Sequence, residues 1–69
     1  MIEIKINGKT SKVDDNATVA EVARLMGLPD DATGVAVAVN ASVVPKGEWR
    51  TRRLAPGDVV EIIRAMQGG

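Results

Sequence analysis

The sequence has no cysteine and no histidine, and Trp49 is its single aromatic residue. Without cysteine the chain can form no disulfide and offers no thiol as a nucleophile or metal ligand. Without histidine it lacks the commonest metal ligand and the usual general base at neutral pH. We therefore expect neither an autonomous enzyme nor a metal site, and we expect the chain to bind no cofactor of its own.

An excess of charge of either sign is also missing, because nine basic residues balance nine acidic ones. Nucleic acid favours a basic excess, so no nucleic-acid partner is expected. No apolar run approaches the roughly 18 residues that a membrane-spanning helix needs. The first residues match a strand rather than a signal peptide, and we expect a soluble, cytoplasmic protein with no membrane partner.

The N-terminal part of the chain has the pattern of a β-hairpin. Residues 2–6 alternate isoleucine with charged residues, as in a half-buried strand whose isoleucines face inward. Asn7 and Gly8 follow, and both tolerate the positive φ angles of a two-residue hairpin turn. Residues 10–13 would return as a short, polar strand suited to the edge of a sheet.

A short helix is predicted to begin after Thr18. Thr18 and Glu21 match a capping box, in which each side chain accepts a hydrogen bond from the backbone amide of the other residue. Gly27 suits the left-handed position that ends a helix, and Pro29 blocks its continuation. The residues expected on the buried face of this helix are Val19, Val22, Ala23 and Met26.

The rest of the chain contains three further strand patterns. Residues 35–39 alternate valine with alanine, Asn40 is interpreted as a turn residue, and residues 43–44 form a short strand that a proline ends. Residues 55–58, Ala-Pro-Gly-Asp, have the order of a type II turn. Residues 59–65 are the last predicted strand.

The order of these elements predicts the fold. If the first and last strands lie side by side and parallel at the centre of a sheet, the helix crosses one face in the right-handed sense. This is an α+β fold of the ubiquitin-like β-grasp type, with a mixed sheet of about five strands and one main helix packed on one face. We expect one β-grasp domain over residues 1–65 and a flexible C-terminal tail over residues 66–69.

The last strand is expected to have one buried and one exposed face. Glu61 cannot be buried cheaply, so Val60 and Ile62 on either side of it should point at the helix. Val59, Glu61 and Ile63 then lie on the opposite face, which no second helix covers. Loops could bury this face in part, but we favour a partner docking patch, because exposed apolar patches usually mark docking sites.

The chain ends in two glycines. They place no side chain around the last carboxylate, so an extended tail of Met66, Gln67, Gly68 and Gly69 could thread a partner's narrow channel. A strand that runs directly into such a tail favours chemistry at the Gly69 carboxylate itself. The alternative is a frayed terminus without function.

Arg50, Arg52 and Arg53 form a local basic cluster beside Trp49. We interpret the cluster as part of a solvated loop, and the alternative is a charged rim that steers the protein toward acidic partner surfaces. Trp49 is interpreted as a residue that fills the edge of the core under a long loop, rather than as a partner anchor.

Several motifs along the chain resemble the ThiS family, the small sulfur carrier proteins of thiamine biosynthesis. The resemblance covers nearly the whole chain, and residues 37–49 are its most specific part. Met66-Gln67 departs from it, because relatives commonly carry small or apolar residues there. The matching motifs are the isoleucine-rich first strand with Asn7-Gly8, Thr18-Val19, Val37-Ala38-Val39-Asn40, Val43-Val44-Pro45, Trp49, Pro56-Gly57-Asp58 and the terminal Gly68-Gly69.

The resemblance implies a carrier protein that is a co-substrate of partner enzymes rather than an enzyme. An E1-like adenylyltransferase of the ThiF type would use ATP to convert the Gly69 carboxylate to an acyl-adenylate. A persulfide sulfur donor would displace AMP and leave a thiocarboxylate on Gly69. A thiazole synthase of the ThiG type would then accept the sulfur, and the carrier alone would be a monomer.

Other functions share the fold and the diglycine end. The small subunit of molybdopterin synthase and the sulfur carriers of cysteine biosynthesis would keep the thiocarboxylate and change the pathway. A ubiquitin-like protein modifier would be attached to lysines through Gly69. A third class is an interaction module with an inert tail. An acyl carrier is not expected, because neither Ser11 nor Ser42 lies at a helix start that suits the modified serine of such a carrier.

Overall fold

The computed structural model describes residues 1–28 and 33–64 of the 69-residue chain. Over these ranges the chain forms five strands, one α-helix and one short 3-10 helix. The predicted order of strands and α-helix is confirmed, and Ala65, expected as the last residue of the final strand, lies outside the described residues. The bounds are β1 Ile2–Ile6, β2 Lys9–Val13, α1 Val19–Leu25, β3 Val35–Val39, β4 Ser42–Val44, η1 Lys46–Glu48 and β5 Val59–Arg64.

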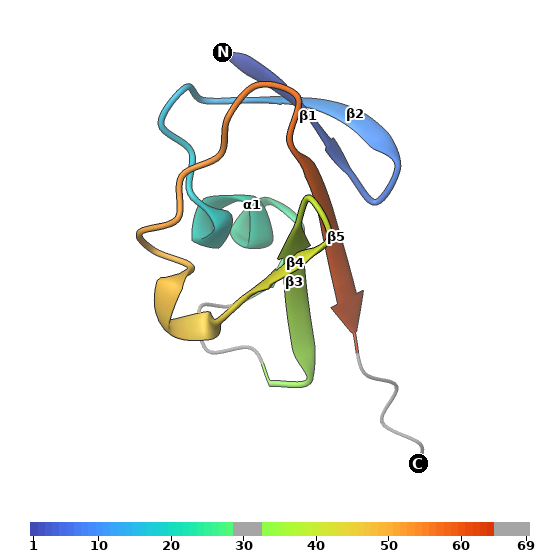
Figure 1. Ribbon diagram of the computed structural model, residues 1–69, viewed down its shortest axis with the longest axis vertical. Coiled ribbons are helices and arrows are strands. Elements are labelled where there is room, and N and C mark those ends of the chain that lie inside the picture. Colours follow the sequence, from blue (N-terminus) through green and yellow to red (C-terminus); the bar gives the residue numbers. More distant parts are fainter. Residues whose placement is uncertain (29–32, 65–69) are drawn as a thin grey trace.

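The strands form one sheet in the order β2-β1-β5-β3-β4 (Figure 1). Strands β1 and β5 are parallel, whereas the other three neighbouring pairs are antiparallel. Helix α1 lies against one face of this sheet (Figure 1). A mixed sheet with one helix on one face is the predicted ubiquitin-like β-grasp fold, and β5 occupies its centre.

The core lies between α1 and the sheet, and alternation along the strands decides which residues enter it. On β1, Ile4 and Ile6 are buried and Ile2 is half-buried, while Glu3 and Lys5 between them are exposed. The inward direction predicted for the three isoleucines is therefore confirmed. Residues of the other segments that are buried in the same core are Val13, Ala17, Val19, Val22, Ala23, Leu28, Val37, Val39, Val44, Trp49, Leu54 and Val60.

The start of α1 is bonded to the loop between η1 and β5. The amides of Val19 and Ala20, which have no acceptor inside the helix, donate to the carbonyls of Arg52 and Trp49 at 3.0 and 2.8 Å. Trp49 is only 3% exposed, and its indole Nε1 donates to the Val44 carbonyl at 3.0 Å. The interpretation of Trp49 as a residue that fills the edge of the core is therefore confirmed.

Both ends of α1 match their sequence signals. The Thr18 hydroxyl accepts a hydrogen bond from the Glu21 amide at 3.3 Å, which is the first bond of the predicted capping box. At the other end Gly27 has a φ angle of 85°. The amides of Gly27 and Leu28 donate to carbonyls of the last turn at 2.9 and 3.0 Å, which is the Schellman arrangement.

The predicted buried face of the helix is wrong at Met26. The helix ends at Leu25, so Met26 is its C-cap and leaves the inward stripe, and 42% of its surface is exposed. Leu28 takes the place in the core that was expected for Met26. The reason is the left-handed turn at Gly27, which folds the chain back so that the Leu28 amide bonds to the Ala23 carbonyl.

Candidate functional site

Strand β5 has the two faces that its sequence predicts. Val60 is fully buried in the core and Ile62 is half-buried, whereas Val59, Glu61 and Ile63 are exposed. Solvent reaches 40% of the Val59 surface and 57% of the Ile63 surface. The face of β5 away from α1 is therefore exposed, with two apolar side chains on either side of Glu61, and its use as a docking patch remains a prediction.

Strand pairing places further apolar residues beside the exposed face of β5. Ala36 pairs with Ile63, Ala38 pairs with Glu61, and Val43 pairs with Ala38. Paired residues project from the same side of a sheet, and the alanines are too small to cover their neighbours. We call this surface the outer patch, and its members are the exposed Val43, Val59 and Ile63 together with the half-buried Ala36 and the buried Ala38.

Val43 is a member of the outer patch that the sequence pattern did not single out. Adjacent residues of a strand point to opposite faces, so only one of two consecutive valines can enter the core. Val44 is buried, and 69% of the Val43 surface is exposed. Two consecutive valines in so short a strand indicate that one of them is exposed, but which one depends on the pairing of β4 with β3.

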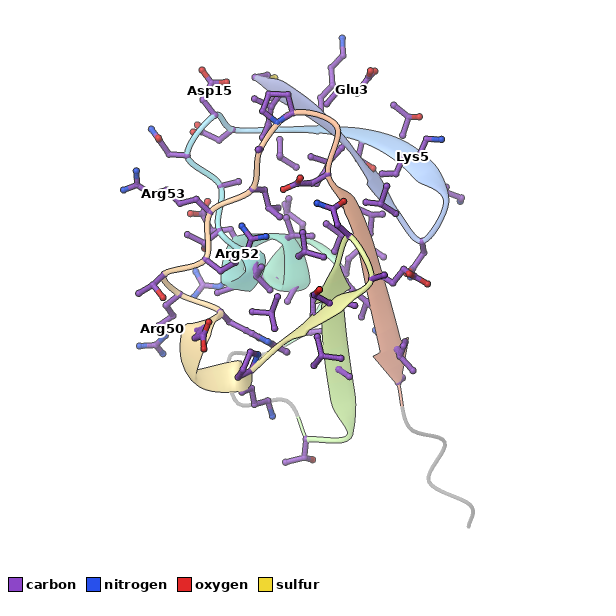
Figure 2. All side chains as sticks on the ribbon, in the orientation of Figure 1. Glu3, Lys5, Asp15, Arg50, Arg52 and Arg53 are labelled. Atoms are coloured by element: carbon purple, nitrogen blue, oxygen red, sulfur yellow. The ribbon has the colours of Figure 1, made fainter. Side chains whose placement is uncertain are left out.

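The other half of the same sheet face carries charge. Lys5 pairs with Val59 on one side and with Thr10 on the other, and Glu3 pairs with Lys12. Figure 2 shows the Glu3 and Lys5 side chains projecting outward from β1. The sheet face away from α1 thus has a charged half over β2 and β1 and an apolar half over β5, β3 and β4.

Two asparagine side chains hold the backbone of β5 from the neighbouring hairpin turns. Asn7, with a φ angle of 50°, accepts a hydrogen bond at Oδ1 from the Ile62 amide at 2.8 Å. Asn40, with a φ angle of 51°, accepts one at Oδ1 from the Val59 amide at 3.0 Å. The predicted turns at both asparagines are confirmed, and their side chains bond to β5 from both of its neighbours.

Asn40 also does more than the turn role expected of it. Its Nδ2 donates to Asp58 Oδ1 at 3.0 Å, and Asp58 Oδ2 accepts from the Ala55 amide at 2.8 Å. Gly57 has a φ angle of 84°, and the Asp58 amide donates to the Ala55 carbonyl at 3.1 Å, as in the predicted type II turn. The turn that precedes β5 is thereby bonded to the β3–β4 turn, which fixes where β5 begins.

The predicted tail, Met66, Gln67, Gly68 and Gly69, lies outside the described residues. Chemistry at Gly69 and threading of the tail into a channel therefore remain predictions. The strand that precedes this tail is the central strand of the sheet, and it contributes two residues to the outer patch.

The basic cluster of Arg50, Arg52 and Arg53 lies away from the outer patch. The three residues are exposed on the segment between η1 and β5, and Figure 2 shows them along that segment beside α1. Arg52 donates from Nη1 to the Arg53 carbonyl at 2.9 Å. Their exposure agrees with a solvated loop, and a steering role toward acidic partners remains a hypothesis.

Three further observations concern the ranges 1–28 and 33–64. No group of three or more potential ligand side chains in them could hold a metal ion. None of their helical segments has the length and hydropathy of a membrane span. The hydrogen bond and the negative charge of Asp15, 2.6 Å away, raise the pKa of the Met1 amino group. This pair lies where β1 begins, at the opposite end of the sheet from Arg64.

The sequence profile of the ThiS family matches residues 3–69, which is nearly the whole chain and includes the terminal glycines. The chain belongs to the ThiS family. The family resemblance inferred from the motifs is therefore confirmed. No curated protein sequence gives a significant match to this chain.

Solved structures give the same result. The crystal structure of a thiamine biosynthesis protein (ThiS) from Geobacter metallireducens is 28% identical, with 99% of this chain and 100% of that chain covered and a TM-score of 0.79. An NMR solution structure of a thiamine biosynthesis protein from the same organism is 28% identical, covering 99% and 88%, with a TM-score of 0.77. SAMP1 from Haloferax volcanii, at 22% identity, 99% and 98% coverage and a TM-score of 0.63, shares the fold.

Proposed function

We propose that this chain is a sulfur carrier of thiamine biosynthesis, and that the carboxyl group of Gly69 carries the sulfur as a thiocarboxylate. The observation that carries the proposal is the ThiS family match over residues 3–69, which takes in Gly68 and Gly69. The thiamine biosynthesis protein of Geobacter metallireducens, aligned over its full length at 28% identity, supports the same pathway. The chain is a co-substrate, and the catalytic groups belong to its partner enzymes.

The chemistry begins with activation of Gly69. A terminal carboxylate is anionic at neutral pH and therefore a poor electrophile. An E1-like adenylyltransferase of the ThiF type joins this carboxylate to the AMP part of ATP and releases pyrophosphate. The acyl-adenylate that results has AMP as its leaving group.

Sulfur transfer then takes two steps. The terminal sulfur of a persulfide donor attacks the acyl carbon and displaces AMP, which gives an acyl disulfide. A thiol attacks the donor-side sulfur of that disulfide, so that the thiocarboxylate leaves and a new disulfide forms between thiol and donor. Because this chain has no cysteine, both the persulfide and the thiol belong to partners. A thiazole synthase of the ThiG type accepts the sulfur.

The outer patch supports this proposal, because a partner that acts on Gly69 must lie beside the strand that leads to it. Val59, Glu61 and Ile63 form the predicted docking surface on β5, and the structure adds Val43 to its apolar part. An exposed apolar surface with a carboxylate at its middle fits a partner surface that is apolar and carries a cation.

Mass spectrometry tests the proposal directly. The protein is incubated with an E1-like adenylyltransferase, ATP and a persulfide donor, and then cleaved after Arg64 with trypsin. We expect the peptide of residues 65–69 to gain the mass difference between sulfur and oxygen. Sulfur on an internal residue, or no gain at all with an adenylyltransferase from the same genome, would contradict the carrier mechanism.

Two variants are the controls. Removal of Gly68 and Gly69 should abolish the mass gain, and one bulky residue appended after Gly69 should do the same. Binding of the loaded carrier to thiazole synthase, to the large subunit of molybdopterin synthase or to a cysteine synthase identifies the pathway. Conjugates to lysines on a denaturing gel would indicate a protein modifier instead.

A further inference from the structure

The hydrogen bonds of β5 show which side of the strand each backbone group faces. The Val59 carbonyl accepts from the Asn40 amide at 2.8 Å, on the β3 side. The Val60 carbonyl accepts from the Asn7 amide at 2.9 Å, and the Ile62 amide donates to Asn7 Oδ1, on the β1 side. Backbone groups of alternate residues face the same side of a strand. The Ile62 carbonyl and the Arg64 amide therefore also face the β1 side.

Strand β1 does not extend far enough to pair with these two groups. It ends at Ile6 and pairs with β5 through Lys5–Val59 and Ile6–Val60. The chain then turns away at Asn7, and the Asn7 side chain supplies the acceptor that a longer strand would have offered to the Ile62 amide. Within residues 1–28 and 33–64, no strand lies beside the Ile62 carbonyl and the Arg64 amide.

We propose that the enzyme that activates Gly69 adds an extended segment of its own to this open edge of β5. One residue of a strand parallel to β5 can donate to the Ile62 carbonyl and accept from the Arg64 amide. Exposed strand edges are recognised in this way by added strands, with main-chain hydrogen bonds supplying the affinity. The added segment continues the line of β1, whose pairing with β5 ends at Val60.

The length of the tail places an enzyme that acts on Gly69 beside this edge, and we commit to the activating enzyme because it is the first to react with the carboxylate. Five residues follow Arg64. A fully extended chain of five residues spans about 17 Å at most. Any enzyme that reacts with the Gly69 carboxylate therefore places its reacting site within that reach of Arg64, and its surface must border the end of β5. The inference rests on the proposed function in this one respect, that Gly69 is the residue activated.

The outer patch and the open edge then serve different purposes. The outer patch, which Ile63 and Val59 share with β3 and β4, supplies apolar contact on one face. The edge at Ile62 and Arg64 supplies direction, because main-chain hydrogen bonds align the enzyme segment with the strand that precedes the tail. Both features belong to β5, so one enzyme surface can contact them together.

Amide hydrogen exchange tests the inference without any chemistry at Gly69. The protein is mixed with the E1-like adenylyltransferase encoded in the same genome, in the absence of ATP, and exchange is followed residue by residue by NMR. We expect the Arg64 amide to exchange at least tenfold more slowly in the complex than in the free protein. The Ile63 amide, which faces β3, should be protected in both states. An Arg64 amide that exchanges equally fast in the complex would overturn the inference.

Three variants separate the amide from the side chain. Arg64→Pro removes the N–H and Arg64→Ala keeps it, while Lys12→Pro removes an outward-facing N–H from the edge strand β2, where proline is tolerated. We expect Arg64→Pro to weaken binding to the adenylyltransferase about five- to tenfold, as loss of one hydrogen bond predicts. Arg64→Ala and Lys12→Pro should bind within twofold of the unmodified protein, and equal affinity of all three would contradict the proposal.

If Arg64→Pro fails to fold, a chemically synthesised chain with an ester bond in place of the Arg64 amide tests the same hydrogen bond. Replacing the amide nitrogen of Arg64 by an ester oxygen removes the same donor and leaves the side chain and the strand geometry in place. It should weaken binding as much as the proline does. Protection of the Arg64 amide that rises with the concentration of the carrier alone would assign the edge to a second copy and overturn the proposal.

The proposed function fails separately. An adenylyltransferase that binds the carrier and protects Arg64, but adds no sulfur to residues 65–69 when ATP and donor are present, would contradict sulfur transfer and support the strand addition. Normal sulfur transfer with an unprotected Arg64 amide would support the sulfur carrier function and contradict the strand addition.

Discussion

At the scale of the residue, the side chains of Asn7 and Asn40 replace backbone partners that the strands do not supply. Each lies in a hairpin turn at a positive φ angle, and each accepts a hydrogen bond from an amide of β5. Asparagine suits both demands, because it tolerates the left-handed conformation and carries an acceptor on a short side chain. A turn residue therefore also determines how the central strand is held.

Asn7→Gly should lower the free energy of unfolding by about 1 kcal/mol, because glycine keeps the positive φ angle but loses the acceptor for the Ile62 amide. Asn7→Asp keeps an oxygen in the same place and is the matched control, with a smaller loss. Urea unfolding followed by the fluorescence of Trp49 measures both. If Asn7→Gly is as stable as the unmodified protein, the side-chain bond contributes nothing.

Trp49→Phe should destabilise the fold by about 1–3 kcal/mol, because the Val44 carbonyl loses its buried donor. Trp49→Ala should cost about 3–5 kcal/mol, since it also removes the side chain that fills the edge of the core. Far-UV circular dichroism during urea unfolding is the measurement, because the fluorescent residue is gone. A Phe variant with unchanged stability would show that packing alone explains the burial of Trp49.

At the scale of the element, α1 depends on its two ends. Seven residues are too few for a helix that is stable by itself. Carbonyls of Arg52 and Trp49 accept the first amides, and the turn at Gly27 satisfies carbonyls of the last turn. The long loop after η1 is thus a partner of the helix as well as a connection between strands.

Gly27→Ala should cost about 1 kcal/mol, because alanine at a φ angle of 85° is strained. A Cβ at Gly27 would meet no atom within 4 Å, so the whole cost is in the backbone. Gly47→Ala is the control, since a Cβ there also meets open space and its φ angle lies outside the left-handed range. Thermal unfolding compares the two, and equal midpoints would show that the left-handed turn does not limit the stability of α1.

At the scale of the whole molecule, one helix covers one face of the sheet and leaves the other face open. The open face is divided between charge over β1 and β2 and the apolar outer patch over β5, β3 and β4. Because the patch lies on the strand that precedes the tail, docking and delivery of Gly69 are geometrically coupled in the proposed carrier.

Ile63→Lys should leave the fold intact and weaken binding to the adenylyltransferase about tenfold or more, because it replaces an exposed apolar side chain of the outer patch with a charge. Leu25→Lys is the matched control, as Leu25 is 71% exposed on α1, on the other side of the molecule. Calorimetric titration and thermal unfolding are measured for both variants. Unfolding of Ile63→Lys, or an equal loss of affinity in Leu25→Lys, would refute the outer patch as the docking surface.

Features that depend on neighbours in the sequence could be predicted well. The turn at Asn7-Gly8, the left-handed Gly27 and the inward direction of Val60 follow from local backbone preference and from alternation. Met26 and Val43 could not be placed in this way. The first depends on the residue at which the helix ends, and the second on which strand lies across from it.

The order of the strands and of α1 and the two faces of β5 could be predicted from the sequence, because periodicity and turn chemistry act over a few residues. The family followed from the resemblance of the motifs, and the 3-10 helix η1 was not predicted. The three-dimensional fold was needed to show that Asn7 bonds to Ile62, 55 residues away, and that within the described residues no strand pairs with β5 on the β1 side beyond this bond. It also decided that Val43 joins the outer patch. These features arise from pairing between distant strands, and the point at which each strand stops relative to its neighbour has no local signal.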